Sequence, residues 1–163
     1  MIIETARLRL VLESTEAILA RIEAMSPADR AAVSPDWLAR LGGAAMSPWT
    51  HGFAMVDSIT GVVVGTCAFK GPPGSDGAVE VAYAVEPSFQ GRGFAKEATA
   101  ALVEVALHAG ARVVRAHTRP EHGASPRVLA ACGFERVGDV LDPEDGLVWR
   151  WELVPRPAQQ STQ

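Results

Sequence analysis

Residues 90–95 read Gln-Gly-Arg-Gly-Phe-Ala, a loop whose two glycines and one arginine suit the binding of an anion. The stretch before this loop, Val79–Val85, alternates and is rich in valine, which predicts a half-buried strand. Pro87 ends that strand, because proline cannot donate to a ladder. From Phe94 to Ala109, apolar residues recur at helical spacing. The order strand, glycine loop, helix directs free backbone N–H groups and a positive helix end toward an anion.

Two familiar phosphate-binding motifs are excluded. A nucleotide-binding P-loop ends in Gly-Lys-Ser or Gly-Lys-Thr, whereas here Gly93 is followed by Phe94. A dinucleotide-binding fingerprint needs a third small residue, which would fall at Lys96, and an acidic residue after the next strand. That strand, Arg112–Ala116, runs instead into His117. The anion is therefore bound by some other kind of loop.

A Gln-x-x-Gly-x-Ala loop that enters a helix behind a strand resembles the acyl-CoA signature of the GNAT superfamily of N-acetyltransferases. Residues 5–10, Thr-Ala-Arg-Leu-Arg-Leu, are similar to the opening of the branch that includes ribosomal-protein N-terminal acetyltransferases. The stretch from Ser125 to Gly133-Phe134 resembles the second half of the same branch, although His122 stands where asparagine is usual. The resemblance covers residues 5–152.

The resemblance implies acetyl-CoA as cosubstrate, with its pyrophosphate on the loop amides. It also implies that the strand before the loop and the strand after the helix are parallel and diverge. The thioester end would lie in that opening and pair with unused backbone groups. The residues implied to bind the cofactor are Ala84, Val85, Gln90, Gly91, Arg92, Gly93, Phe94 and Ala95.

Two residues are candidates for proton transfer. Glu80 lies on the face of its strand opposite Val79 and Tyr83, and a base there would neutralise an ammonium before it attacks a thioester. Tyr83 itself is interpreted as a core residue. Ser125 has two interpretations, which are compatible. It is a helix cap, or, as the resemblance implies, it returns a proton to the departing thiolate.

Composition and charge narrow the possible partners. The 163-residue chain has a formal net charge of −4 and no basic stripe, so nucleic acid is not expected. No stretch is long and apolar enough to span a membrane, and no signal peptide is evident. The two cysteines, Cys67 and Cys132, are expected to be reduced, which indicates a cytoplasmic protein. His117 and His122 have no evident third ligand, so no metal is expected.

The fold class predicted from the resemblance is α/β, the GNAT fold, a mixed and mostly antiparallel sheet with helices on both faces. Glu4–Leu12 alternates and predicts the first strand, and Ser26 and Ser34, each before a proline, predict two helix starts. We expect residues 1–154 to form one domain and residues 155–163 a flexible tail. We expect an N-acetyltransferase, a monomer or homodimer, that transfers the acetyl group directly to an amine. The alternative is a non-catalytic acyl-CoA-binding sensor or structural module.

Overall fold

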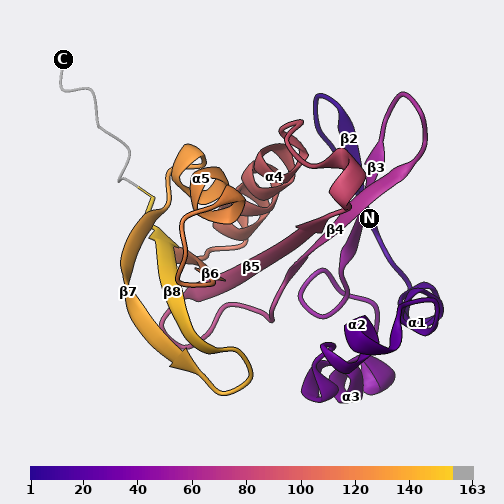
Figure 1. Cartoon of the computed structure of the whole chain (residues 1–163), viewed down its shortest axis with the longest axis horizontal. Coiled ribbons are helices and arrows are strands. Elements are labelled where there is room, and N and C mark those ends of the chain that lie inside the picture. Colours follow the sequence, from indigo (N-terminus) through magenta and orange to yellow (C-terminus); the bar gives the residue numbers. More distant parts are fainter. Residues whose placement is uncertain (156–163) are drawn as a thin grey trace.

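The computed structural model describes residues 1–155 and contains one eight-stranded sheet in the order β1-β2-β3-β4-β5-β6-β8-β7 (Figure 1). Every pair of neighbouring strands is antiparallel except β5 and β6, which are parallel. The predicted mixed sheet is confirmed. Of the predicted tail, all but Pro155 lies outside the described residues. The strands are β1 Ile2–Glu4, β2 Leu8–Leu12, β3 Phe53–Asp57, β4 Val63–Phe69, β5 Ala78–Val85, β6 Val113–Thr118, β7 Glu135–Asp142 and β8 Gly146–Leu153.

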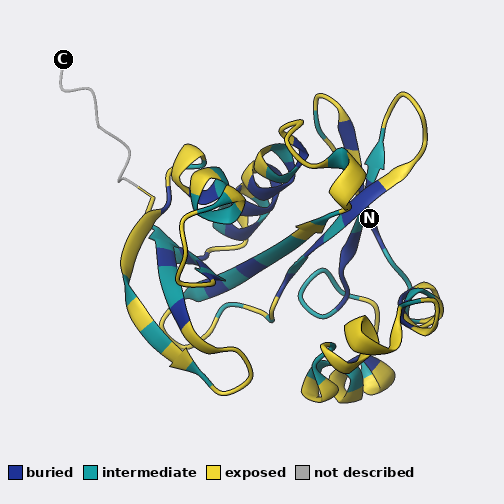
Figure 2. Cartoon of the chain, in the orientation of Figure 1, coloured by how far each residue is buried: buried dark blue, intermediate teal, exposed yellow. Residues whose placement is uncertain are grey.

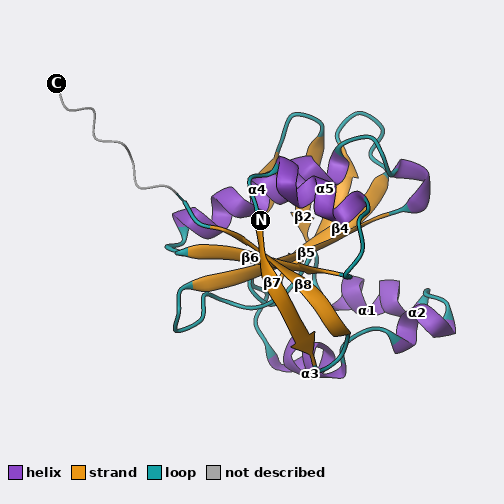
Figure 3. Cartoon of the chain, turned by 60° about the vertical axis from the view of Figure 1, so that its left-hand side comes forward, coloured by secondary structure: helices purple, strands orange, loops and turns teal. Residues whose placement is uncertain are grey.

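Helices cover both faces of this sheet. The helices α4 and α5 lie together on one face, and α1, α2 and α3 lie on the other side, beyond β2–β4 (Figures 1 and 3). Their bounds are α1 Thr15–Glu23, α2 Pro27–Ala31, α3 Pro35–Gly43, α4 Phe94–His108 and α5 Ala124–Ala131, with one 3-10 turn at Pro87–Phe89. No helix within residues 1–155 has the length and apolar character needed to cross a bilayer.

The short N-terminal helices begin where the sequence predicted. The hydroxyls of Ser26 and Ser34 accept hydrogen bonds from Asp29 N–H and Trp37 N–H, and a proline occupies the first turn of each helix. Such caps satisfy N–H groups that have no partner within the helix. They matter here because α2 has no buried residue to hold it in place by packing.

The predicted first strand, Glu4–Leu12, was wrong as a single element. The chain reverses at Thr5, whose N–H donates to the carbonyl of Leu8 while its hydroxyl oxygen accepts a hydrogen bond from the Leu8 N–H. β1 then pairs antiparallel with β2, with Ile2 opposite Val11. The alternating pattern continued through the turn, so periodicity alone did not reveal it.

Apolar residues form two separate clusters. The main core lies between the sheet and α4, where Ala98, Leu102 and Ala106 are buried against the strands. A smaller cluster joins Ile18 and Ile22 of α1 to Leu41 of α3. Figure 2 shows the contrast, with buried bands along β5 and α4 and mostly exposed residues on α1–α3.

Candidate active site

The parallel strands β5 and β6 are paired only at their beginnings. Ala78, Val79 and Glu80 lie opposite residues 113–115 of β6, and the pairing ends there. On its other side β5 stays paired with β4 as far as Val85. The second half of β5 therefore has one edge without a strand partner, as the resemblance predicted.

The direction of backbone groups alternates along β5. Lys70 N–H donates to the carbonyl of Glu80, and Glu86 N–H likewise bonds to β4, each at 2.9 Å. Even-numbered residues of the strand therefore hydrogen-bond with β4. In an antiparallel pair the residues between them direct their N–H and C=O to the opposite side. Tyr83 and Val85 thus direct their backbone groups into the gap left by β6.

This alternation separates the two strand residues that were expected to serve the cofactor. The backbone of Ala84 faces Thr66 of β4 and is in use. That of Val85 faces the gap, and its carbonyl accepts a hydrogen bond of 3.0 Å from the side-chain amide of Gln90. Tyr83 fits the backbone role expected of Ala84. Its side chain packs against the core, as predicted, yet its hydroxyl lies 3.4 Å from the carbonyl of Ser125.

Two glycines shape the loop between β5 and α4. Gly91 and Gly93 have φ angles of 78° and 82°, in the left-handed region where a side chain is strained. Gly93 is the N-cap of α4 and provides no side-chain cap. The first N–H groups of this helix consequently remain available, and the helix dipole is positive at the same place. This is the arrangement that binds phosphate at helix starts.

Hydrogen bonds and an ion pair among Thr5, Arg7 and Glu97 hold the first turn of α4 to the turn between β1 and β2. The carboxylate of Glu97 accepts hydrogen bonds from the Thr5 hydroxyl and the Arg7 N–H, and Arg7 Nε lies 3.0 Å from its other oxygen. Burial alone would raise the pKa of Glu97, but these donors together hold that pKa below its usual value. The Arg7 guanidinium also lies 4.7 Å above the ring of Phe94. These contacts therefore fix the start of α4, next to the glycine loop.

The loop, the open edge of β5 and the start of α5 enclose a cavity of about 500 Å³, here called the cofactor cavity. Eight of the ten predicted site residues line it: Ala84, Val85, Gln90, Gly91, Gly93, Phe94, Ala95 and Ser125. Arg92 lies outside, with its guanidinium 5.4 Å from the ring of Phe89. Glu80 also lies outside. The fold thus brings together seven of the eight residues predicted to bind the cofactor, and Ser125, but not Arg92 or the predicted base.

Ser125 is not a helix cap. The helix α5 begins at Ala124 with Gly123 as its N-cap, and no side chain caps it. That expectation is wrong because the helix starts earlier than Pro126. Ser125 and Tyr83 both line the cofactor cavity. Burial raises the pKa of the Tyr83 phenol above its ordinary value, against the effect of its hydrogen bond to Ser125, so the phenol is protonated at neutral pH.

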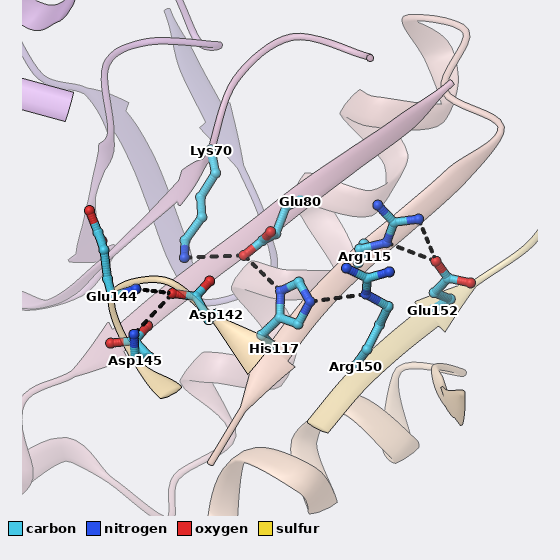
Figure 4. A network of polar contacts seen from close by, with 9 residues as sticks. All are labelled: Lys70, Glu80, Arg115, His117, Asp142, Glu144, Asp145, Arg150 and Glu152. Atoms are coloured by element: carbon cyan, nitrogen blue, oxygen red, sulfur yellow. Dashed lines mark hydrogen bonds and ion pairs between the residues drawn. The ribbon is translucent and has the colours of Figure 1, made fainter. Parts of the chain in front are cut away.

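Glu80 lies on the opposite face of β5, within a chain of polar contacts (Figure 4). Its Oε2 atom is 3.1 Å from Lys70 Nζ and 3.1 Å from His117 Nδ1. Arg150 Nε donates to the other ring nitrogen of His117, Nε2, at 3.1 Å. Because an arginine Nε–H can only donate, Nε2 accepts, the proton resides on Nδ1, and His117 is a neutral donor to Glu80. No hydrogen bond to Glu80 Oε1 occurs within residues 1–155.

Lys70 and His117 were missed as site residues, because no spacing in the sequence links them to Glu80. Burial has the largest single effect and lowers the pKa of Lys70, but Glu80, together with smaller contributions from Asp145 and Asp142, raises this pKa above its ordinary value. The network continues across the same face of the sheet, where Arg115 contacts Glu152 at 2.7 Å. The sequence cue was weak: Arg115 and His117 alternate with buried residues in β6, as Arg150 and Glu152 do in β8.

The two histidines that were considered as metal ligands make contacts with different residues. His117 belongs to the Glu80 network, whereas His122 packs edge-on against Trp149, with ring centroids 5.2 Å apart. Within the described part of the chain, no group of three or more histidine, cysteine, aspartate or glutamate residues has the arrangement of a metal site. His122, at the position where the family has asparagine, does not line the cofactor cavity.

Comparisons with known proteins agree with this geometry. The family model of the acetyltransferase (GNAT) domain matches residues 8–135. The fold is similar to that of a GNAT-family acetyltransferase from Bordetella pertussis, at 25% identity and a TM-score of 0.68, covering 93% of this chain and 98% of the other. It is also similar to a ribosomal L7/L12 α-N-protein acetyltransferase in complex with coenzyme A, at 16% identity and a TM-score of 0.71, covering 94% and 98%. None of the curated proteins matches.

A third solved structure has a different acceptor in its name. It is a spermidine N-acetyltransferase chimera from Vibrio cholerae and hSSAT, at 15% identity and a TM-score of 0.70, covering 91% of this chain and 96% of the other. The chain belongs to the GNAT family of acetyltransferases, whose members use acetyl-CoA. The predicted family and the predicted activity, acetyl transfer to an amine, are confirmed.

Proposed function

We propose that acetyl-CoA occupies the cofactor cavity and that its acetyl group passes directly to an amine that approaches from the Glu80 face. The observation that carries this proposal is the meeting of the α4 helix start and the unpaired edge of β5 at one cavity. The amides of Gly91–Ala95 would hold the pyrophosphate. The pantetheine arm would pair with Tyr83 and Val85. Five residues of strand, about 17 Å, separate Val85 from Glu80, so the arm carries the thioester toward the Glu80 end of β5.

Glu80 is the proposed base. An amine must lose its ammonium proton before its nitrogen can attack a carbonyl carbon. Glu80 Oε2 is occupied by Lys70 and His117, whereas Oε1 is available to accept that proton, directly or through one water. His117 and Lys70 act as positioning residues that fix the carboxylate.

Ser125 is the proposed source of the proton for the departing thiolate, and Tyr83 is a second hydroxyl in the same cavity. The raised pKa of Tyr83 favours the protonated phenol, which suits a donor. Both hydroxyls lie on the α4 side of β5, and the proposed base lies on the other. Proton removal and proton return would therefore occur on opposite sides of the thioester.

Initial-rate kinetics with a panel of amines test the proposal, with the N-acetyl product measured by mass spectrometry. Direct transfer predicts intersecting double-reciprocal lines, and no acetylated protein when acetyl-CoA is added alone. Parallel lines and an acetylated protein would contradict it, because they indicate an acyl-enzyme. Tight binding of acetyl-CoA with no product from any amine would favour the non-catalytic module instead.

The cellular location and assembly belong to the same proposal. Cys67 and Cys132 are both free thiols, which suits a reducing compartment such as the cytoplasm. A monomer or a homodimer is expected. Analytical ultracentrifugation at several concentrations would reveal any larger assembly.

A further inference from the structure

A second cavity lies where the two apolar clusters meet. Trp37, which packs against the small cluster, lines it on one side, and Trp49 and Phe69 of the main core line it on the other. The indole N–H of Trp37 donates to the Thr50 carbonyl at 3.0 Å, and the rings of Trp49 and Phe69 lie 4.9 Å apart. Aromatic side chains held in this way offer fixed apolar walls. We call this space the tryptophan cavity.

The tryptophan cavity has a volume of about 460 Å³, which is within the range of small-molecule sites. Ala39 and Gly43 of α3 both line it. Residues four apart share one face of a helix, so a side chain at Gly43 would also face the cavity. A Cβ atom there would meet nothing within 4 Å. These small residues leave room for a group as large as an aromatic ring.

The charges around this cavity are of one sign. Its only charged lining residues within the described chain are Arg40 and Lys70, and no ion pair involving Arg40 is present in residues 1–155. A neighbouring cavity of about 600 Å³, the histidine cavity, is lined by His117, by Arg119 and by the acidic residues Glu121, Glu144 and Asp145. Lys70 lines both cavities. A cationic group is thus favoured on one side of Lys70 and an anionic or apolar group on the other.

Lys70 also connects these cavities to the proposed chemistry, because its ammonium pairs with Glu80 at 3.1 Å. An acceptor ammonium that reaches Glu80 must compete with this contact. A bare polyamine would displace Lys70 from its ion pair with Glu80 and add positive charge beside Arg40. An α-amino acid brings both charges, so its ammonium can replace Lys70 at Glu80 while its carboxylate pairs with Lys70. The side chain of Lys70 is half exposed and free to make this exchange.

We propose that the acceptor is an α-amino acid with a large apolar side chain, which occupies the tryptophan cavity while the α-ammonium meets Glu80 and the carboxylate meets Lys70 and Arg40. This inference rests on the proposed function. In the reaction the ammonium loses one proton to Glu80, and the neutral nitrogen bonds to the acetyl carbon as the C–S bond breaks. The second nitrogen proton passes to the thiolate by way of Ser125 or Tyr83. The products are the N-acetyl amino acid, coenzyme A as a thiol, and one proton released from Glu80.

Four amines separate the parts of this acceptor, with rates compared per mole of neutral amine. L-phenylalanine carries all three features, L-alanine lacks the apolar body, L-phenylalaninamide lacks the carboxylate, and spermidine lacks both. We expect kcat/KM for L-phenylalanine to exceed that of each of the others at least tenfold. Equal or faster turnover of the amide would remove the carboxylate contact, and faster turnover of spermidine would overturn the proposal while leaving the proposed function intact.

A pair of variants on α3 tests the cavity itself. Gly43→Leu places a side chain on the cavity face, whereas Gly42→Leu is a matched control on a residue that does not line the cavity and also meets nothing within 4 Å. We expect Gly43→Leu to raise KM for L-phenylalanine at least tenfold with little change for L-alanine. Gly42→Leu should change KM for L-phenylalanine and for L-alanine less than twofold. Equal effects of the two variants would contradict the placement of the apolar body.

Calorimetry separates this inference from the proposed function. L-phenylalanine is titrated into the protein bound to coenzyme A, which holds the cofactor site without allowing turnover. If the parent binds L-phenylalanine and Gly43→Leu binds it tenfold more weakly, the acceptor class is supported, even if no acetylated product forms with acetyl-CoA. Absence of binding, together with acetylation of other amines, would overturn the acceptor class alone.

Discussion

On the α4 side of β5, the cofactor cavity is built mainly from one continuous stretch, residues 83–96, to which α5 adds one wall. On the other side, the polar network joins Glu80 of β5 and His117 of β6 to Lys70, which directly follows β4. The tryptophan cavity adds α3 and the loop before β3. The first region sits on the main core, and the second lies between two clusters. Both regions share β5, whose residues point alternately to one side and the other.

This difference indicates a division of tasks. We propose that binding on the cofactor side depends on backbone groups, which a local motif of glycines sets in place and which most side-chain changes would leave intact. The proposed acceptor side consists instead of side chains brought together across the sheet. We therefore expect substitutions on the two sides to affect different steps, binding of acetyl-CoA on one and proton transfer or acceptor choice on the other.

The largest expected effect is that of Glu80→Gln. The amide keeps the size of the side chain but cannot accept the ammonium proton, so kcat/KM for a fixed amine should fall roughly 10²-fold. The affinity for acetyl-CoA should not change. The rate should recover at a pH well above the pKa of the amine, where no base is needed.

Glu152→Gln is the control for that prediction. Glu152 pairs with Arg115 on the same face of the sheet but does not contact Glu80. It should change kcat/KM less than threefold. A deficit in Glu80→Gln that persists unchanged at high pH would remove Glu80 from the mechanism as a base.

Gly93→Val should weaken binding of acetyl-CoA by tenfold or more, about 1.4 kcal/mol. Its φ angle of 82° strains any side chain, and an added Cβ would lie 3.1 Å from Arg7 Nη2. Gly110→Val introduces comparable strain, at φ of 92°, beyond the far end of α4. Calorimetry should show that Gly110→Val binds acetyl-CoA as tightly as the parent protein does. Equal losses in both variants would mean that strain, not approach of the cofactor, weakens binding.

Cys67, which lies opposite Tyr83 in the register of β4 and β5, should make stability fall at alkaline pH. Burial, with a smaller effect of Glu13, raises the pKa of its thiol to about 12 from 9.0. Between these values the unfolded chain has lost the proton and the native protein has kept it, so rising pH favours unfolding. The stabilisation is complete below pH 9 and declines above it, by about 1.4 kcal/mol at pH 10.

Urea denaturation of the parent and of Cys67→Ala between pH 8 and pH 10 measures this decline. The variant should be less stable at pH 8 but should lack the slope that the parent shows above pH 9. Parallel profiles in the two proteins would show that Cys67 does not cause the slope.

The smallest expected effect is that of Arg92, which lies outside the cofactor cavity. If its charge attracts a cofactor phosphate through solvent, Arg92→Ala should weaken acetyl-CoA binding two- to threefold and Arg92→Lys less. Raised salt should reduce the difference. If neither variant changes the affinity for acetyl-CoA at low salt, Arg92 has no part in cofactor binding and only contacts Phe89.

The residues of the proposed cofactor side could be predicted from the sequence because they are contiguous and because the positive φ angles of Gly91 and Gly93 require glycine. The family resemblance supplied the parallel pair and its divergence. The acceptor side could not be predicted in the same way, since Lys70 and His117 meet Glu80 only after β4, β5 and β6 align. The turn at Thr5 and the start of α5 at Ala124 were missed because a side-chain hydrogen bond and a glycine cap leave little trace in hydrophobic periodicity.

Residue-resolved amide hydrogen exchange, measured by NMR with and without acetyl-CoA, tests most directly the claim that the open edge of β5 holds the cofactor. We predict an alternation along the strand. The amides of Tyr83 and Val85 should exchange quickly in the free protein and slowly with acetyl-CoA, together with those of Gly91–Ala95. The amides of Ala82 and Ala84, paired with β4, should be slow in both states. Bound acetyl-CoA that leaves Tyr83 and Val85 in fast exchange would contradict the account.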